Sequence, residues 1–221
     1  MTVGVVGLGA GGHAKVLLDI LLGAPGIELL GLLDPDPALG GAWVMGVPVL
    51  GGDDLLAGVR AMGAGGFFVG VGSVGSTRKR ERLFALGLEA GLEPVDAVHG
   101  RAVRSPFARH GPGLALLAGA VLNPGASLGA NVVVNTGAVV EHDCLVGDHA
   151  FIAPGALVLG GARIGAGAFL GAGCVVRQGL EVGAGAVVGA GSVVVRNVLA
   201  GERVVGNPAR LLTHQTQDPL P

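Results

Sequence analysis

The sequence predicts a two-part fold: an α/β N-terminal Rossmann-like domain followed by an all-β parallel β-helix of hexapeptide repeats. Two observations lead to this prediction. From Leu116 to Val194, every sixth residue is Leu, Ile or Val, and no insertion breaks the count. The start of the chain reads as a buried strand, a glycine-rich loop, an apolar helix and a second strand, which is the order of a βαβ unit.

A period of six matches neither an α-helix nor a strand with two alternating faces. It matches a parallel β-helix in which each hexapeptide forms one short strand and one turn. Three hexapeptides close a triangular coil, and successive coils stack at strand spacing, about 4.8 Å. The place four residues after each aliphatic mark is nearly always small, as at Ala156 and Ala162. A Gly/Ala-rich low-complexity segment is the alternative, but low complexity would not hold one register over residues 116–199.

Composition excludes several classes of function. The formal net charge is −2 and the 14 basic residues form no long block, so neither nucleic acid nor an anionic membrane is an expected partner. Glycine and proline interrupt every apolar run that could span a membrane, and we expect no signal peptide. Both cysteines, Cys144 and Cys174, fall in the small inward column. We therefore expect buried thiols in a reduced, cytoplasmic protein.

The first elements follow one another closely along the chain. Residues 3–8 form a predicted strand, residues 9–13 a tight loop, residues 14–22 a helix and residues 27–33 a second strand that ends at Asp34. In a parallel sheet of this kind, ligands bind at the carboxyl ends of the strands.

The loop after the first strand carries a phosphate-binding pattern. Residues 7–12 match G-x-G-x-x-G, and Asp34 follows 22 residues after Gly12. This is a dinucleotide fingerprint, yet its parts suit any nucleoside diphosphate. Glycines let a phosphate approach the backbone, the helix N-terminus attracts negative charge, and the acid can bind ribose hydroxyls. A turn without a ligand is the alternative.

Further elements complete a small first domain. We expect strands at residues 47–50, 67–71 and 95–98, and a helix from Ser76 to Ala90 whose basic first turn lies on a solvated face. The predicted division is a nucleotide-sugar-binding domain at 1–97, a linker at 98–113, the β-helix at 114–212 and a loose tail at 213–221. A first domain of this size is too short for a two-half dinucleotide domain, which counts against a dehydrogenase.

Reactive side chains stand out in the β-helix because most positions there are glycine, alanine or aliphatic. His142 lies two places after the inward Val140, at an outward or corner position, and Asp143 follows it. Eighteen residues later, Gly160 has no side chain to cover the imidazole. A carboxylate beside a histidine fixes its tautomer and raises its basicity, as a general base requires.

Two alternatives remain for the same histidine. It could be a surface residue without a role, or a metal ligand. His149 is the one other histidine in the predicted coils, and no third ligand is evident, so we predict no metal site.

Several motifs together resemble the hexapeptide acyltransferases, in particular the sugar acetyltransferases that begin with a Rossmann-like domain. That group includes the nucleotide-sugar N-acetyltransferases of bacillosamine and perosamine and the sialic acid O-acetyltransferases. The motifs are Gly11-Gly12-His13, Leu33-Asp34, Val71-Gly72, Val98-His99, Asn135-Thr136, Val140 through Cys144, and Val205 through Arg210. The resemblance implies that the β-helix is left-handed.

The resemblance also implies roles for individual residues. His142 matches the catalytic base and Asp143 the acid that orients it. The positions that match the nucleotide cradle are Gly11, Gly12, His13, Asp34, Pro35 and Gly72, and those that match acetyl-CoA contacts are Gly160, Ala172 and Ala190. Family members are homotrimers with each site between two subunits. Many carry a second histidine nine places after the base, where this chain has Phe151, so the acceptor is the open question.

The sequence therefore predicts an acetyltransferase that moves acetyl from acetyl-CoA to an amino or hydroxyl group of a sugar, in particular a nucleotide-linked one. A non-enzymatic nucleotide-sensing or scaffold trimer is the second hypothesis. An NAD-dependent oxidoreductase is a third, but it leaves the whole repeat unexplained.

Overall fold

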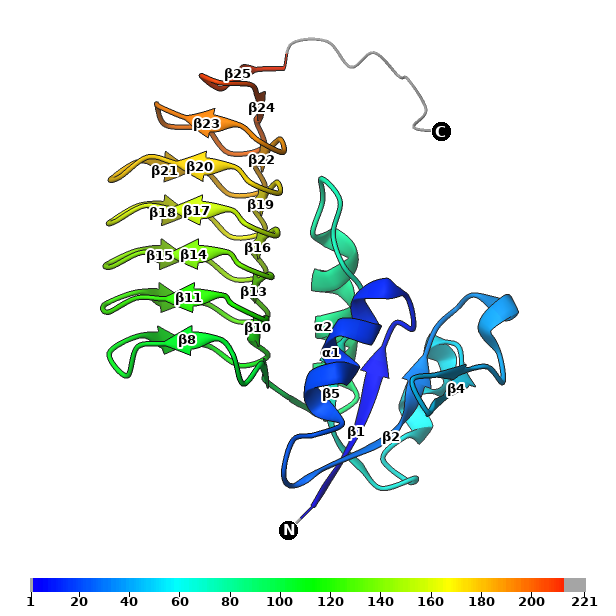
Figure 1. The fold of residues 1–221 in the computed structure, drawn as a ribbon. Coiled ribbons are helices and arrows are strands. Elements are labelled where there is room, and N and C mark those ends of the chain that lie inside the picture. Colours follow the sequence, from blue (N-terminus) through cyan, green and yellow to red (C-terminus); the bar gives the residue numbers. More distant parts are fainter. Residues whose placement is uncertain (1, 213–221) are drawn as a thin grey trace.

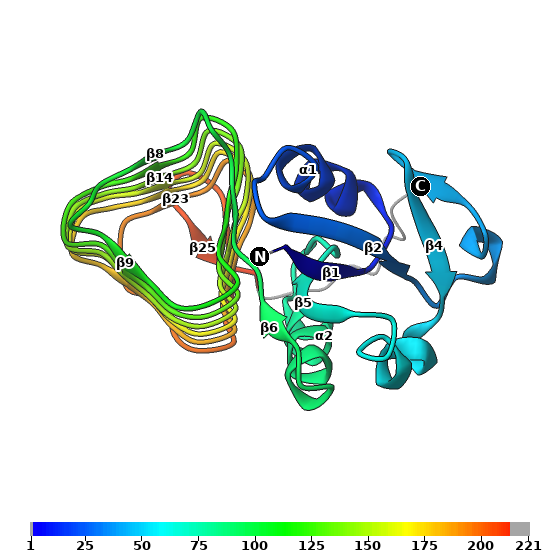
Figure 2. The same ribbon diagram turned by 90° about the horizontal axis from the view of Figure 1, so that it is seen from below.

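The computed structural model describes residues 2–212 and confirms the two-part architecture. An α/β domain lies beside a three-sided β-helix, and the β-helix axis runs along one side of that domain (Figure 1). Seen along this axis, the β-helix has a triangular outline, and the α/β domain packs against one of its three sides (Figure 2). The predicted loose tail, 213–221, lies outside the described residues.

The N-terminal domain is a six-stranded sheet in the order β3-β4-β2-β1-β5-β6. Its strands are β1 (Val3–Leu8), β2 (Ile27–Leu33), β3 (Trp43–Val44), β4 (Val47–Gly51), β5 (Ala64–Val69) and β6 (Glu93–Pro94). All neighbouring pairs are parallel except β3–β4. The carboxyl ends of β1, β2 and β5 therefore meet at one edge, where the loops that follow them come together.

Two helices cover opposite faces of this sheet (Figure 2). Helix α1 (Gly12–Leu21) buries Leu17, Leu18 and Leu21 on one face, and α2 (Arg78–Glu89) buries Leu83 and Phe84 on the other. The short 3₁₀ helices η1 (Pro37–Leu39) and η2 (Asp53–Gly58) lie in the connections after β2 and β4. No helix among residues 2–212 combines the length and the apolarity that crossing a membrane requires.

The β-helix is made of two-residue strands that stack into three parallel faces. The first face holds β7 (Ala97–Val98), β10 (Ala115–Leu116), β13 (Val133–Val134), β16 (Phe151–Ile152), β19 (Phe169–Leu170), β22 (Val187–Val188), β24 (Arg203–Val205) and the antiparallel β25 (Arg210–Leu211). The second holds β8 (Val103–Arg104), β11 (Val121–Leu122), β14 (Val139–Val140), β17 (Leu157–Val158), β20 (Val175–Val176) and β23 (Val193–Val194). The third holds β9 (Arg109–His110), β12 (Ser127–Leu128), β15 (Leu145–Val146), β18 (Arg163–Ile164) and β21 (Glu181–Val182).

The stacking follows the repeat without slippage. Val140 pairs with Val158, and Val158 pairs with Val176, so partners lie three hexapeptides apart. These inward side chains, together with the small column at Ala156 and Ala162, form one buried cluster that runs the length of the prism. Burial of aliphatic surface along this column is the main stabilising term.

The predicted linker is wrong, because residues 98–113 form the first coil of the β-helix. Strand β7 pairs with β10, β8 with β11, and β9 with β12. The six-residue count continues backwards through this coil, but its inward positions hold Arg104 and His110 rather than aliphatic residues. The Arg104 guanidinium and His110 Nε2 lie 2.8 Å apart at the open end of the prism, where polar side chains can reach water.

Some boundaries in the first domain also differ from the prediction. The expected strand at 95–98 is divided, because β6 ends at Pro94 in one sheet and β7 begins at Ala97 in another. Strand β5 starts at Ala64 and ends at Val69, ahead of the expected 67–71. After Ala200, strands β24 and β25 close the last coil.

The two parts share a hydrophobic interface. Leu17, Leu18 and Phe68 of the α/β domain cluster with Ala115 and Phe151 on the outer side of the first face. The expectation of a solvated basic face on α2 is wrong for Arg80, whose exposed fraction is 2%. The reason is that this turn of α2 faces the β-helix rather than solvent.

Candidate active site

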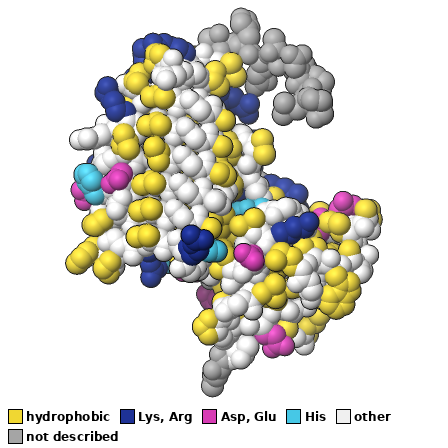
Figure 3. All heavy atoms as spheres, in the orientation of Figure 1, with side chains coloured by type: hydrophobic (Ala, Val, Ile, Leu, Met, Phe, Trp, Pro, Cys, Tyr) yellow, Lys and Arg dark blue, Asp and Glu magenta, His cyan; other side chains and the backbone are white. Residues whose placement is uncertain are grey.

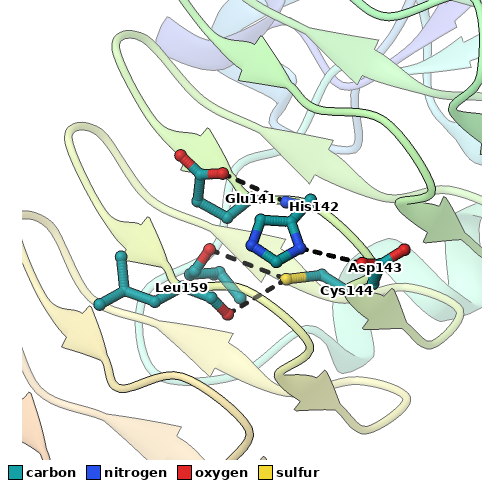
Figure 4. Close-up of polar contacts among 6 residues, drawn as sticks. Glu141, His142, Asp143, Cys144 and Leu159 are labelled. Carbon is teal, nitrogen blue, oxygen red and sulfur yellow. Dashed lines mark hydrogen bonds and ion pairs between the residues drawn. The ribbon is translucent and has the colours of Figure 1, made fainter.

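His142 stands at the corner between the second and third faces, just after β14 ends at Val140 (Figure 4). Its side chain is 60% exposed, and its Nδ1 lies 2.9 Å from the Asp143 carboxylate. With Nδ1–H donating to Asp143, Nε2 is left as the basic nitrogen, and it lies beside Gly160 of the next coil. The roles of base and orienting acid stay predictions.

The backbone at this corner explains why the acid can reach the imidazole. Asp143 has φ +58°, in the left-handed region, whereas Gly125, Gly161 and Gly179 fill the same place in neighbouring coils with similar φ. A non-glycine residue in this region is uncommon and is retained where the surrounding structure holds it. The turn thus directs the Asp143 carboxylate toward Nδ1.

Gly160 lies directly against the His142 imidazole, as the spacing predicted. A Cβ added at Gly160 would come 2.5 Å from His142 Nε2. The N–H of the next residue, Gly161, donates to the His142 carbonyl over 2.9 Å. The neighbouring coil is therefore bare of side chain beside His142 Nε2.

Glu141 and Cys144 flank the pair without joining it (Figure 4). The Glu141 carboxylate accepts from the backbone N–H of His142 at 3.2 Å. Cys144 points inward, and its thiol lies 3.3 Å from the Leu159 carbonyl. Burial raises the pKa of the Cys144 thiol and raises that of Cys174 to about 12, so neither is a nucleophile. Both are free and buried, as predicted.

A groove of about 880 Å³ runs between the α/β domain and the β-helix. It brings together Gly12, His13 and Gly72 from the predicted nucleotide cradle and Ala172 and Ala190 from the predicted acetyl-CoA positions. Its other lining residues are Val16, Ser73, Val74, Gly75, Asn135, Phe151, Ala153, Pro154, Phe169 and Gly171. Glycine and serine form one wall, and aromatic and small residues form the other.

Three residues predicted for the cradle, Gly11, Asp34 and Pro35, lie outside the lining of this groove. The Asp34 carboxylate accepts from the N–H of Ala10 at 2.8 Å and from that of Asp36 at 3.0 Å. In this structure Asp34 therefore fixes the loop after β1.

His13 is held as a neutral imidazole. Burial lowers its pKa to about 3, and the nearby Arg80 guanidinium contributes to the shift. Among the described residues its Nε2 has no hydrogen-bond partner. A neutral imidazole can form a hydrogen bond with a ligand through Nε2. It carries no positive charge that would attract a phosphate.

An aromatic stack in the groove was missed by the sequence analysis. The rings of Phe151 and Phe169 lie 5.6 Å apart and nearly parallel, and His13 is 6.1 Å from Phe151. Phe151 and Phe169 are one coil apart and precede inward residues, and this spacing was a signal for the stack. His149 does not replace the histidine missing at position 151, because its ring packs against Phe84 instead.

The groove and the His142 corner are separate places on a single chain. Ala172 and Ala190 follow the first-face strands β19 and β22, whereas His142 and Gly160 follow the second-face strands β14 and β17. The two pairs therefore stack at different corners of the prism. Within residues 2–212 no cluster of three or more metal-ligating side chains is present.

Comparisons with known proteins agree with the two-part fold. Residues 5–85 match the model of the PglD N-terminal domain, and residues 125–160 and 161–196 match the bacterial transferase hexapeptide model. No functionally curated sequence gives a significant match.

Two solved structures resemble nearly the whole chain. One is a histidine mutant of perosamine N-acetyltransferase from Caulobacter crescentus in complex with CoA and GDP-perosamine. It is 38% identical with a TM-score of 0.88, over 94% of this chain and 96% of that one. The other is the acetyltransferase domain of PglB from Neisseria gonorrhoeae in complex with acetyl coenzyme A, 34% identical with a TM-score of 0.87, over 96% and 100%.

The hexapeptide β-helix and the matched family models place this chain among the hexapeptide transferases. The chain belongs to the family of sugar acetyltransferases that join a PglD-type N-terminal domain to hexapeptide repeats. It is an acetyl-CoA-dependent enzyme, which sets aside both the scaffold and the oxidoreductase hypotheses.

Proposed function

We propose that this enzyme acetylates the amino group of a nucleotide-linked sugar, as a homotrimer whose sites lie between subunits. The observation that carries the proposal is the exposed His142–Asp143 pair beside the bare Gly160 step. The solved relatives named above, with CoA, acetyl-CoA or GDP-perosamine in their complexes, support the choice of donor and acceptor.

His142 is the general base of the proposed reaction. Its Nε2 takes a proton from the sugar amine as the nitrogen attacks the acetyl carbonyl, and it returns the proton to the departing thiolate. Asp143 accepts the Nδ1 hydrogen bond, so it fixes the productive tautomer and stabilises the imidazolium that forms in between. Acetyl-CoA supplies the thioester, whose acetyl group is transferred.

The Gly160 backbone is our candidate for oxyanion stabilisation. Its N–H makes no backbone hydrogen bond among the described residues, and its Cα lies beside the imidazole. An N–H donor positioned where negative charge develops lowers the barrier without reorganisation.

The proposed acceptor site is the groove between the two parts. Helix α1 begins at Gly12, and a Cβ added at Gly11 or Gly12 would meet nothing within 4 Å. This open helix N-terminus suits the diphosphate of a nucleotide sugar. The place of His13 and Gly72 in the lining supports their proposed cradle roles, whereas Asp34 and Pro35 lie outside it.

The separation of the groove from His142 supports the proposed trimer. Because they lie at different corners of one chain, a site that uses both draws on a second copy. The outer side of the second face offers apolar surface for such contact, since Val103 is 61% exposed and Phe107, beyond the same strand, is 76% exposed. Hydrophobic side chains form vertical rows along the β-helix (Figure 3), and such surface is typical of interfaces.

We place the reaction in the cytoplasm. Acetyl-CoA is the co-substrate of the family, and the two cysteines are free thiols, as expected in a reducing compartment.

Thermal shift combined with an acetyl-transfer screen tests the proposal. The protein is melted with acetyl-CoA and with UDP- and GDP-linked amino sugars, and each sugar is then assayed by mass spectrometry for a gain of one acetyl group. We expect acetyl-CoA to raise Tm, because a ligand at 100 times its Kd adds about 2.7 kcal/mol of stability. A protein that ignored acetyl-CoA and acetylated no sugar in the panel would not have this function.

A further inference from the structure

Arg80 is a buried cation that the catalytic scheme does not use. Its side chain lies between α2 and the β-helix, and no carboxylate lies within ion-pair distance of it among the described residues. Burial lowers the pKa of Arg80 to about 10, so the guanidinium is still charged at neutral pH. A charge buried without a counter-ion opposes folding, and its presence needs an explanation.

One end of the guanidinium holds the loop that follows β5. Its Nη1 donates to the Val71 carbonyl at 2.6 Å and to the Val69 carbonyl at 3.2 Å. The next residues along the chain, Gly72 and Ser73, line the groove between the domains. Arg80 thus fixes the backbone from which one wall of the groove continues.

The other end of the guanidinium holds the β-helix. Its Nη2 donates to Asn131 Oδ1 at 2.7 Å, and the Asn131 amide lies 3.0 Å from His149 Nδ1. In addition, the Arg80 guanidinium lies 6.0 Å from the centroid of the Phe151 ring, which lines the opposite wall of the groove. The Arg80 side chain therefore contacts both the loop that leads into one wall of the groove and the β-helix residues at the other wall.

The backbone conformation at Asn131 and His149 indicates that their side chains have a structural role. Asn131 and His149 have φ of +54° and +61°, at a corner where the neighbouring coils use Gly113 and Gly167. Glycine is the residue that adopts this conformation without strain. The chain departs from glycine in the two middle coils of this corner, and in both the side chain joins the Arg80 network.

We propose that Arg80 is a positioning residue for the acceptor: it links the loop after β5 to Asn131 and so sets the spacing between Gly72 and Phe151 across the groove. This inference rests on the proposed function, because it takes the groove as the nucleotide-sugar site. Arg80 does not touch the reacting atoms, and the acetyl-CoA contacts at Ala172 and Ala190 lie farther along the β-helix.

The Asn131→Gly variant tests the proposal most cleanly. Glycine suits the left-handed φ at this position, so the variant should fold while the link from Arg80 to the β-helix is lost. We expect KM for the amino-sugar nucleotide to rise about tenfold to a hundredfold, since a displaced binding wall has effects of this size. KM for acetyl-CoA should change much less, because Ala172 and Ala190 lie in coils beyond that of Phe151.

Two variants of Arg80 and one control variant complete the experiment. Arg80→Met should raise the acceptor KM at least as much as Asn131→Gly, and Arg80→Lys, which keeps the charge but not the fork, should fall between Met and the wild type. Phe84→Leu is the matched control. Phe84 lies on the same helix and packs against His149 at the same interface, but it does not line the groove, so it should lower Tm without changing the acceptor KM.

The outcomes distinguish failure of the proposed function from failure of the proposed role of Arg80. If the wild type transfers acetyl to no sugar of the panel, the proposed function fails. If the wild type is active and Asn131→Gly and Arg80→Met change Tm alone, as Phe84→Leu does, or raise both KM values equally, then Arg80 is only a structural residue and the inference is overturned.

Discussion

A missing side chain at Gly160 matters as much for the proposed chemistry as the imidazole it faces. The ring of His142 rests against this glycine, and the space that a methyl group would fill is the space beside Nε2. The base is thus positioned by Asp143 on one side and by bare backbone on the other. The proposed reaction accounts for the residues at this corner, since the rest of the coil needs only small and aliphatic side chains.

Gly160→Ala should lower kcat while leaving the fold intact. The new Cβ would lie 2.5 Å from His142 Nε2, so the imidazole must move away from its productive position. Because the imidazole is exposed and can move, Tm should change by no more than a few degrees. A misplacement of about 1 Å can lower the rate about 100-fold. Steady-state kinetics beside a thermal melt check this, and unchanged kcat would show that the contact is incidental.

His13 makes stability depend on pH in a defined direction. Its pKa is about 3 in the folded protein, against 6.5 for a histidine in contact with water, so the unfolded chain binds a proton that the folded chain does not. Stability from this residue is complete above pH 6.5 and is lost as pH falls toward 3. The slope is at most about 1.4 kcal/mol per pH unit.

Urea unfolding at fixed protein concentration, compared at pH 7 and pH 5, measures this slope. His13→Gln removes the titrating group, so the variant should lose less stability than the wild type over the same interval. Equal losses in the two proteins would mean that His13 is not held neutral in the folded state.

At the scale of elements, the hexapeptide repeat presents the same outward place again on each coil. Ala172 and Ala190 occupy this place one coil apart, and both are exposed along the groove. Small residues there leave a channel parallel to the β-helix axis, which suits a long, thin donor.

Ala190→Leu should raise KM for acetyl-CoA at least tenfold, because the larger side chain fills the channel while the backbone is unchanged. KM for the sugar nucleotide should change much less. Ala184→Leu is a matched control, since Ala184 is equally exposed but lies outside the groove lining. Equal effects of the two substitutions would remove Ala190 from the donor site.

The elements also show what the sequence could predict and why. The period of six determined the strands from β10 to β23, because one aliphatic residue in six is a signal that every coil repeats. It did not reveal the first coil, where Arg104 and His110 take inward positions at the open end of the prism. The short strand β3 carried no comparable pattern.

The candidate site also has one part that the sequence could predict and one part that it could not. The relation of His142 to Gly160 follows from the repeat alone. The groove does not, since its walls depend on how the α/β domain sits against the first face, and contacts such as Arg80 with Asn131 join residues 51 apart in the sequence. Asp34 shows the limit most clearly, because its carboxylate is engaged by the Ala10 N–H.

At the scale of the whole molecule, one chain holds both parts of the proposed site but not next to each other. The groove opens beside the first face, and His142 stands at the far edge of the second. The proposed trimer resolves this separation by placing the corner of one copy at the groove of the next.

Val103→Glu should break the trimer and abolish activity together. A charge at this exposed apolar position of the second face would be buried without a partner in the interface, which is strongly unfavourable. Light scattering after size exclusion measures the mass. Leu22→Glu, at an exposed leucine of the α/β domain, should leave both mass and activity unchanged. A fully active monomer would show that each chain forms a complete site.

The central claim is that His142 is the base of an acetyl transfer, and the kcat of His142→Ala tests it most directly. With the sugar nucleotide that the wild type acetylates fastest, we predict a fall of about 10²–10⁴-fold. The melting temperature should not change. The kcat of Asp143→Asn should lie between that of the wild type and that of His142→Ala. If His142→Ala kept the wild-type kcat, the imidazole would have no part in the chemistry.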